Sequence, residues 1–197
     1  VIHFPSFLAY LAQVRPGLSY TLDDYFRKNF DPGIIPLFKD ELGFTDEELE
    51  GEYQFWQNWV ATRVPEAYPG MREILERYKA RGGKIAVVSH SDVIHRDYRE
   101  NGLPEPDLIF GWELPPEHRK PHVWPLEQIM AEFQLAPDQL LMLDDLKPGY
   151  DMCRAAGVPF AAAGWANDIP EIEGYMRRNC DYYFKTVAAF GNFLEQQ

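Results

Sequence analysis

Two patterns of apolar residues divide the chain near residue 66. Residues 6–63 carry apolar side chains at helical spacing and no convincing strand pattern. Thr45 and Glu48 predict a capping box at the start of the longest helix, where Leu49, Tyr53 and Trp56 recur on one face. The pattern therefore predicts a helical subdomain, with helices over residues 7–11, 22–30, 34–42 and from 46 onward.

After the segment Tyr68-Pro69-Gly70, helices alternate with short apolar runs. A helix that begins at Met71 stops at Gly82-Gly83 and leads directly into the first of these runs. Such alternation indicates a mostly parallel sheet covered by helices on both faces, so the fold class is α/β. The predicted strands are 85–88, 108–112, 140–143, 159–163 and 182–184, and the predicted helices between them are 92–101, 123–133 and 148–156, with a closing helix after 184.

Composition and net charge disfavour some classes of binding partner. The chain has 197 residues with 19 basic and 31 acidic ones, a formal charge of −12, which disfavours nucleic acid and anionic membranes as partners. A small anionic substrate stays possible where a divalent cation reverses the local field. Cys153 and Cys180 lack metal-site spacing and are interpreted as reduced structural cysteines. Without a transmembrane or signal pattern, a cytoplasmic protein is expected.

Polar residues follow two of the predicted strands, where open α/β sheets gather ligands. Ser89 and His90 follow the strand 85–88, and the serine hydroxyl with nearby backbone N–H groups could hold a phosphate oxygen. Ordinary helix capping explains Ser89 equally well, and His90 is either a substrate contact or a loop histidine. This signal is weak when it is taken alone.

The pair Asp144-Asp145 follows the strand 140–143. Adjacent carboxylates at the edge of an apolar strand repel each other unless a cation neutralises them, and hard oxygen ligands suit Mg²⁺. Helix capping accounts for one carboxylate but not readily for both. Between the two strand ends lies Lys120-Pro121, where a lysine could neutralise phosphate or a carboxylate, although a solvent-exposed lysine is the default.

In this order and spacing, Ser89, Lys120-Pro121 and Asp144-Asp145 followed by Ala155-Ala156-Gly157 resemble the second, third and fourth motifs of the haloacid dehalogenase (HAD) superfamily. The resemblance covers roughly residues 66–190. It implies a Rossmann-like parallel core with an inserted helical cap of the C1 type. The cap is expected over residues 6–65 and the core over 1–5 and 66–197.

The resemblance also implies roles. An aspartate of the first motif attacks phosphorus and forms an aspartyl-phosphate, and a second aspartate two positions later acts as acid and base. Ser89 would bind the transferred phosphoryl group, Lys120 would stabilise the nucleophile and the phosphoryl charge, and Asp145 would ligate Mg²⁺ with support from Asp144. These are the positioning and charge effects on which phosphoryl transfer depends.

Two departures from the family pattern stand out. Gly149 occupies a position where many relatives carry a carboxylate or an asparagine. This difference predicts fewer outer-shell ligands around the metal, or use of Asp144 instead. The first motif is absent, and Asp23 and Asp24 cannot replace it because no strand precedes them. A first core strand that ends in Asp-x-Asp-Gly is therefore expected upstream of Val1, since loss of a central strand would cost much of a total stability of roughly 5–15 kcal/mol.

The leading hypothesis is a Mg²⁺-dependent phosphatase of a small phosphorylated metabolite. A phosphomutase of the same fold and a catalytically inactive binding module are the alternatives, and a dehalogenase is disfavoured because it needs no metal.

The sequence does not identify the substrate. His90 and the cap aromatics Tyr53, Trp56 and Trp59 are candidate contacts, although an aromatic stripe at this spacing more commonly packs in a core.

Overall fold

The computed structural model describes residues 3–196. It divides into two compact units, Val1–Glu66 and Ala67–Gln197, and each unit is considered by itself. Val1 and Ile2, which the sequence assigns to the core, lie outside the described residues, and His3 opens the first helix. The boundaries of cap and core stay a prediction.

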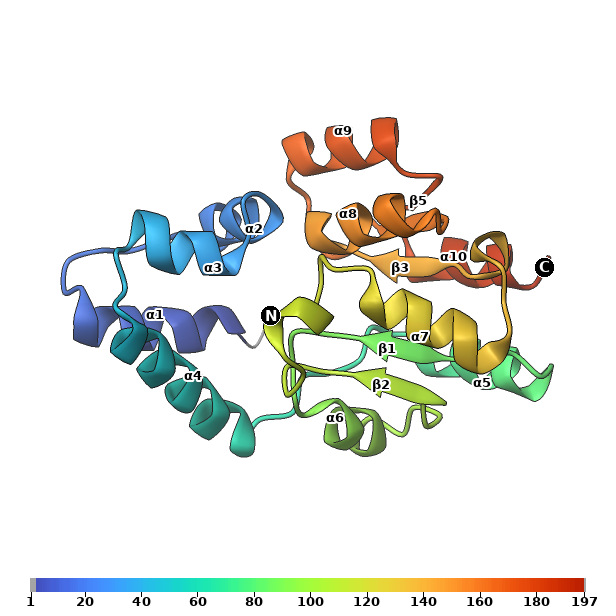
Figure 1. Cartoon of the computed structure of the whole chain (residues 1–197), viewed down its shortest axis with the longest axis horizontal. Coiled ribbons are helices and arrows are strands. Elements are labelled where there is room, and N and C mark those ends of the chain that lie inside the picture. Colours follow the sequence, from blue (N-terminus) through green and yellow to red (C-terminus); the bar gives the residue numbers. More distant parts are fainter. Residues whose placement is uncertain (1–2, 197) are drawn as a thin grey trace. The chain divides into compact units, whose positions relative to one another are not determined.

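The first unit is helical, as the sequence predicts, and residues 3–66 contain no strand (Figure 1). The predicted capping box is present, because the Glu48 N–H donates to Thr45 Oγ1 over 3.2 Å and the Thr45 N–H donates to Glu48 Oε2 over 2.9 Å. The elements are α1 (His3–Val14), α2 (Leu22–Phe30), α3 (Ile34–Pro36), a π-helical turn η1 (Leu37–Glu41) and α4 (Asp46–Ala61).

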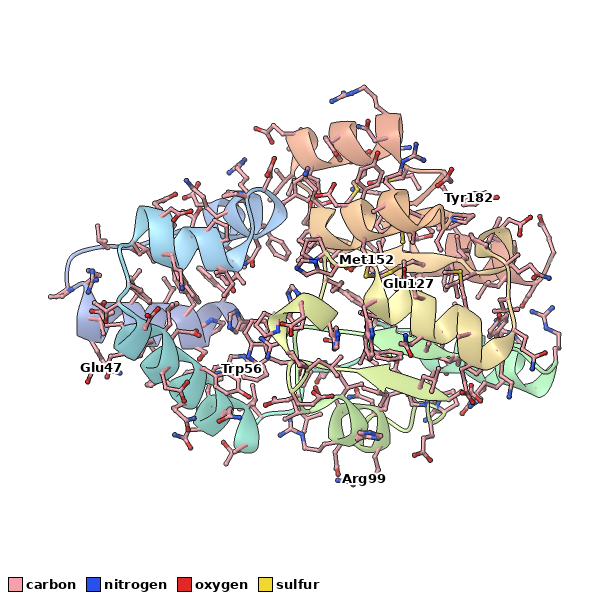
Figure 2. The ribbon with its side chains drawn as sticks, viewed as in Figure 1. Glu47, Trp56, Arg99, Glu127, Met152 and Tyr182 are labelled. Carbon is pink, nitrogen blue, oxygen red and sulfur yellow. The ribbon has the colours of Figure 1, made fainter. Side chains whose placement is uncertain are left out.

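Aromatic side chains dominate the interior of the first unit. Trp56, labelled in Figure 2, is 8% exposed, which fits the interpretation of this residue as packing. Trp59 is only half-buried and lies under the guanidinium of Arg63, 3.9 Å from the ring centroid. The central cluster consists of Phe7, Tyr10, Leu11, Tyr25, Leu37, Phe38, Leu42 and Phe44.

One buried carboxyl interrupts this apolar interior. Glu52 of α4 is 6% exposed, and burial raises its pKa to about 7. Its Oε1 lies 3.6 Å from His3 Nε2, and His3 Nδ1 is hydrogen-bonded to the hydroxyl of Tyr25. Because ionised Glu52 is costly in this environment, the stability of the fold is expected to fall as pH rises from about 4.5 to about 7.

Replacing Glu52 with glutamine is expected to remove this pH dependence. From the raised pKa, we expect the variant to gain up to about 3 kcal/mol in the free energy of unfolding above pH 7. Little change is expected at pH 4.5. Urea unfolding at both pH values measures the effect, with the exposed Glu50→Gln on the same helix as the matched control. Equal behaviour of the two variants at pH 8 would show that Glu52 ionises without cost.

The second unit, Ala67–Gln197, is the α/β part, and all of its predicted strands are present. Its helices are α5 (Met71–Ala80), α6 (Ile94–Glu100), α7 (Trp124–Phe133), α8 (Lys147–Ala156), α9 (Pro170–Asn179) and α10 (Val187–Leu194). Its strands are β1 (Ala86–Val88), β2 (Leu108–Phe110), β3 (Met142–Asp144), β4 (Phe160–Ala163) and β5 (Tyr182–Phe184), and two 3-10 turns are η2 (Pro116–His118) and η3 (Pro137–Gln139).

The described strands form two parallel sheets instead of one. β1 pairs with β2, and β3, β4 and β5 pair in that order, so one edge of β1 and one edge of β3 have no strand partner among residues 3–196 (Figure 1). Pairing also moves a predicted boundary. Asp144 pairs with Ala162 and is the last residue of β3, whereas the sequence places it just after the strand.

A cluster of apolar side chains joins α5, α10 and β3. Ile74 of α5, the helix before β1, clusters with Val187 and Phe190 of α10, and Leu143 of β3 packs against the same cluster. On α8, Met152, which is labelled in Figure 2, is fully buried. The strands β1 and β3 do not pair with each other, but both belong to the compact unit Ala67–Gln197.

Helix α9 is absent from the sequence prediction. Only Ile172 and Met176 of this helix are buried, and Gly174 lies between them, so its apolar pattern is weak. Among residues 3–196, no helix combines the length and the apolar character that crossing a membrane requires.

Candidate active site

An ion pair between Lys120 and Asp144 forms the centre of the candidate site. Asp144 ends β3, and Lys120 lies between η2 and α7. Lys120 Nζ donates to Asp144 Oδ2 over 2.7 Å, and each side chain is only 10% exposed. The other carboxylate oxygen, Oδ1, accepts the N–H of Asp145 over 2.8 Å. Donors on both oxygens hold the Asp144 carboxylate in one orientation.

The pKa values of the two neighbouring carboxyl groups are shifted in opposite directions. Burial alone would raise the pKa of Asp144, but the charge and hydrogen bond of Lys120 outweigh burial and lower that pKa. For Asp145, burial and then the charge of Asp144 raise the pKa. Asp144 is therefore the ionised partner of a lysine, while Asp145 lacks a comparable countercharge.

Gly149 on α8 packs directly against Asp144. A Cβ atom placed on Gly149 would meet Cγ of Asp144 at 2.9 Å and its Cβ at 3.0 Å, closer than real Cβ atoms approach other atoms. The Asp144 carboxylate cannot retreat without leaving Lys120 or the Asp145 N–H. The structure thus gives a steric reason for glycine at this position, where the sequence indicates only a missing ligand.

Ser89 follows β1 directly and takes part in a local turn. Its Oγ accepts the N–H of Ser91 over 3.1 Å, and its own N–H donates to Phe110 O over 2.9 Å. Ser89 does not cap a helix, because α6 begins at Ile94 and its N-cap residue, Val93, has no side-chain cap. The hydroxyl proton of Ser89 stays available as a donor, and its role in phosphate binding stays a prediction.

His90 is a partly exposed loop residue that contacts the lysine segment. Its Nε2 lies 3.2 Å from the carbonyl oxygen of Lys120, and its ring meets the Trp112 ring edge-on with 5.5 Å between centroids. Arg119 lies over the same indole, and His118 stacks on Trp124 with 4.1 Å between centroids. These aromatic partners cannot be found from the sequence, because Trp112 lies in a loop and Trp124 at the start of α7, with no common spacing to the site residues.

A small pocket adjoins Asp145 at the ends of β4 and β5. Tyr68 lies outside this pocket. Burial is the main cause that raises the pKa of Tyr68, and the charge of the nearby Asp145 raises it further. The pocket is lined by Asp145, Ala162, Ala163, Gly164, Asn167, Ile172, Glu173, Met176 and Tyr183. Of these lining residues, only Asp145 is identifiable from the sequence.

The donor set fits a hard cation only in part. Asp144 and Asp145 are adjacent carboxyl groups, and Asp145 is the buried one whose ionised form a cation would favour. Within residues 3–196, no group of three or more His, Cys, Asp or Glu side chains is arranged as a metal site. Any metal here would take its further ligands from water, backbone oxygens, substrate or another carboxylate.

Comparison with known families decides the classification. The sequence model of the haloacid dehalogenase-like hydrolases matches residues 5–163, most of the chain. This chain belongs to the haloacid dehalogenase-like hydrolases. The resemblance proposed from Ser89, Lys120, Asp144 and Asp145 is therefore confirmed at the level of the family.

Individual relatives agree with this family. Pyrophosphatase PpaX of Bacillus cereus (strain Q1) is 26% identical over 156 residues, which cover 75% of this chain and 71% of the relative. A predicted phosphoglycolate phosphatase of Haemophilus somnus has a similar structure, with a TM-score of 0.70, 21% identity, and coverage of 99% of this chain and 90% of the other. CbbY of Rhodobacter sphaeroides, in complex with xylulose-(1,5)-bisphosphate, gives a TM-score of 0.69 at 15% identity, with 95% and 91% coverage.

These structural likenesses establish the α/β fold with a Rossmann-like core and a helical cap that the sequence predicts. Within this haloacid dehalogenase-like core, the structure brings Lys120, Asp144 and Asp145 together and joins His90 to them through the Lys120 carbonyl. The chemical roles of these residues, and that of Ser89, stay predictions.

Proposed function

We propose that the chain is a Mg²⁺-dependent phosphatase of a small phosphorylated metabolite that works through an aspartyl-phosphate. The observation that carries the proposal is the buried Lys120–Asp144 ion pair with Asp145 beside it at the end of β3. A fixed ammonium group beside buried carboxyl groups is suited to binding a transferring phosphoryl group and a cation together. Phosphatases among the similar proteins support the same reaction class.

In this proposal each described residue has one task. The Ser89 hydroxyl donates to a phosphoryl oxygen, and the Lys120 ammonium offsets the negative charge of the phosphoryl group and its nucleophile. Asp144 holds the Lys120 ammonium in place over 2.7 Å. Asp145, supported by Asp144, would hold Mg²⁺, which when bound supplies positive charge to the phosphoryl oxygens.

The proposal includes an aspartate nucleophile on a strand that precedes Val1 in the full-length protein. The interruption between β1 and β3 supports it, because each of these strands has an edge without a strand partner among residues 3–196. A strand parallel to both could pair with each edge. Its carboxyl end would then lie beside the carboxyl ends of β1 and β3, where Ser89 and Asp144 are found.

The test is release of inorganic phosphate by the full-length protein from a panel of sugar phosphates, phosphoglycolate, nucleotides and pyrophosphate, with Mg²⁺ and with a chelator. We expect turnover of at least one member that depends on Mg²⁺. Conversion of a sugar phosphate into an isomer without phosphate release would instead identify a phosphomutase. No turnover of any member in the presence of Mg²⁺ would count against a phosphatase and favour an inactive binding module.

A further inference from the structure

Two contacts hold Lys120, one at its side-chain ammonium and one at its backbone carbonyl. The side chain is fixed by Asp144, as described above. The backbone of the same residue is fixed by His90, whose Nε2 lies 3.2 Å from the Lys120 carbonyl oxygen. A carbonyl oxygen only accepts hydrogen bonds, so His90 Nε2 must carry a proton and donate it. The contact therefore selects one form of the His90 ring.

The environment keeps that ring neutral. Burial lowers the pKa of His90 to about 4, and the positive charge of Lys120 contributes in the same direction. At neutral pH the imidazole thus donates from Nε2 without adding a second positive charge beside the ammonium of Lys120. Protonation below pH 4 would leave the Nε2–H in place, so acid alone does not remove this hydrogen bond.

Trp112 fixes the position of the His90 ring and of the residue before Lys120. The His90 ring meets the indole at 78°, and the Arg119 guanidinium carbon lies 4.1 Å from the Trp112 ring centroid. The backbone N–H of Trp112 donates to the backbone oxygen of Ser91 over 3.3 Å, which ties the loop after β2 to the loop after β1. Together these contacts connect the end of β1 to the lysine segment.

We propose that His90 is a positioning residue for the reaction, which fixes the Lys120 backbone so that the ammonium reaches Asp144, and that it is not a contact of the substrate. This inference rests on the proposed function. It replaces the substrate-binding role that the sequence suggests for His90. Because misplacement of a charged group by about 1 Å can lower a rate roughly a hundredfold, loss of this hydrogen bond affects catalysis.

Two substitutions separate the hydrogen bond from the packing. His90→Phe keeps an aromatic ring against Trp112 but removes the donor, whereas His90→Gln keeps an N–H donor at a similar reach. In the full-length protein we expect His90→Phe to lower kcat roughly ten- to a hundredfold with KM within about twofold, and His90→Gln to restore kcat to within about threefold. His95→Phe, an exposed histidine on α6, is the matched control and should leave both constants unchanged.

A second measurement does not depend on turnover. In protein labelled with ¹⁵N-lysine, the ion pair with Asp144 slows proton exchange of the Lys120 ammonium, so its NH₃⁺ signal is observable and is assigned by its absence in Lys120→Met. We expect this signal to broaden or disappear in His90→Phe and to persist in His90→Gln and His95→Phe. This result holds even if no phosphatase substrate is found, so failure of the proposed function can be recognised separately.

Two outcomes would overturn the inference. A rise in KM with unchanged kcat in His90→Phe would identify His90 as a substrate contact. An unchanged Lys120 signal in the same variant would show that Asp144 alone positions the lysine. Circular dichroism monitors whether His90→Phe stays folded. If it does not, the comparison of His90→Gln with His95→Phe decides. A positioning donor predicts that His90→Gln keeps the Lys120 signal.

Discussion

Asp145→Asn in the full-length protein is expected to abolish Mg²⁺-dependent phosphate release, with a loss of roughly a thousandfold or more. Asparagine has the shape of aspartate but lacks the charge that would anchor the cation, and a bound metal supplies several kcal/mol to such a reaction. Without Mg²⁺ the variant should be at least as stable as the parent protein above neutral pH. The reason is that burial and the charge of Asp144 make ionisation of Asp145 unfavourable in the folded state.

Steady-state kinetics with a Mg²⁺ titration, together with urea unfolding in a chelator, measure both effects. The matched control is Asp151→Asn on α8, since Asp151 is 42% exposed and its 2.8 Å pair with Lys147 lies at the surface. Activity of that control should stay within about twofold of the parent, as for most surface substitutions. Retention of Mg²⁺-dependent turnover by Asp145→Asn would disprove the assignment of Asp145 as the metal anchor.

Lys120→Met is expected to destabilise the fold by about 3–5 kcal/mol at neutral pH, because it leaves the Asp144 carboxylate buried without its countercharge. The effect should depend on pH. In the parent protein the pKa of Asp144 is lowered, so its contribution to stability is present above the unfolded pKa and is lost in acid. In the variant, burial raises that pKa, so stability falls as pH rises. The two proteins should therefore differ most near pH 8 and least near pH 4.

Urea unfolding at pH 4.5 and pH 8 tests this prediction. The double variant Lys120→Met/Asp144→Asn, in which neither residue is charged, should recover most of the loss at pH 8. Lys147→Met is the control, because it breaks an ion pair whose two side chains are 25% and 42% exposed and should cost at most about 1 kcal/mol. A loss in Lys120→Met that is the same at both pH values would show that Asp144 is not the charge left unpaired.

Much of the fold is predictable from local patterns. The first helical unit and the alternation after residue 68 follow from apolar spacing and from glycine stops, and the structure confirms them. The pairing of strands is different, because it depends on contacts between distant segments. The separation of β1–β2 from β3–β4–β5 leaves no trace in the spacing of apolar residues, and neither does the exact end of β3 at Asp144.

The candidate site divides in the same way. Asp144, Asp145 and Lys120 are identifiable because charged residues beside apolar strands are unusual and their order matches a family pattern. The partner of each residue is not identifiable from the sequence. That Lys120 pairs with Asp144, while His90 faces the Lys120 carbonyl, follows from how two loops and the end of β3 meet in space.

The close approach of Gly149 to Asp144 also limits how this enzyme can change. An asparagine or aspartate at position 149 would bring its Cβ into the Asp144 side chain, which Lys120 holds in place. Positions 144 and 149 are therefore expected to show epistasis, because a larger residue at 149 is tolerated only when the side chain at 144 also changes. Evolution of a fuller metal shell from this sequence would require the two positions to change together, and a directed-evolution library that varies position 149 alone should return only glycine.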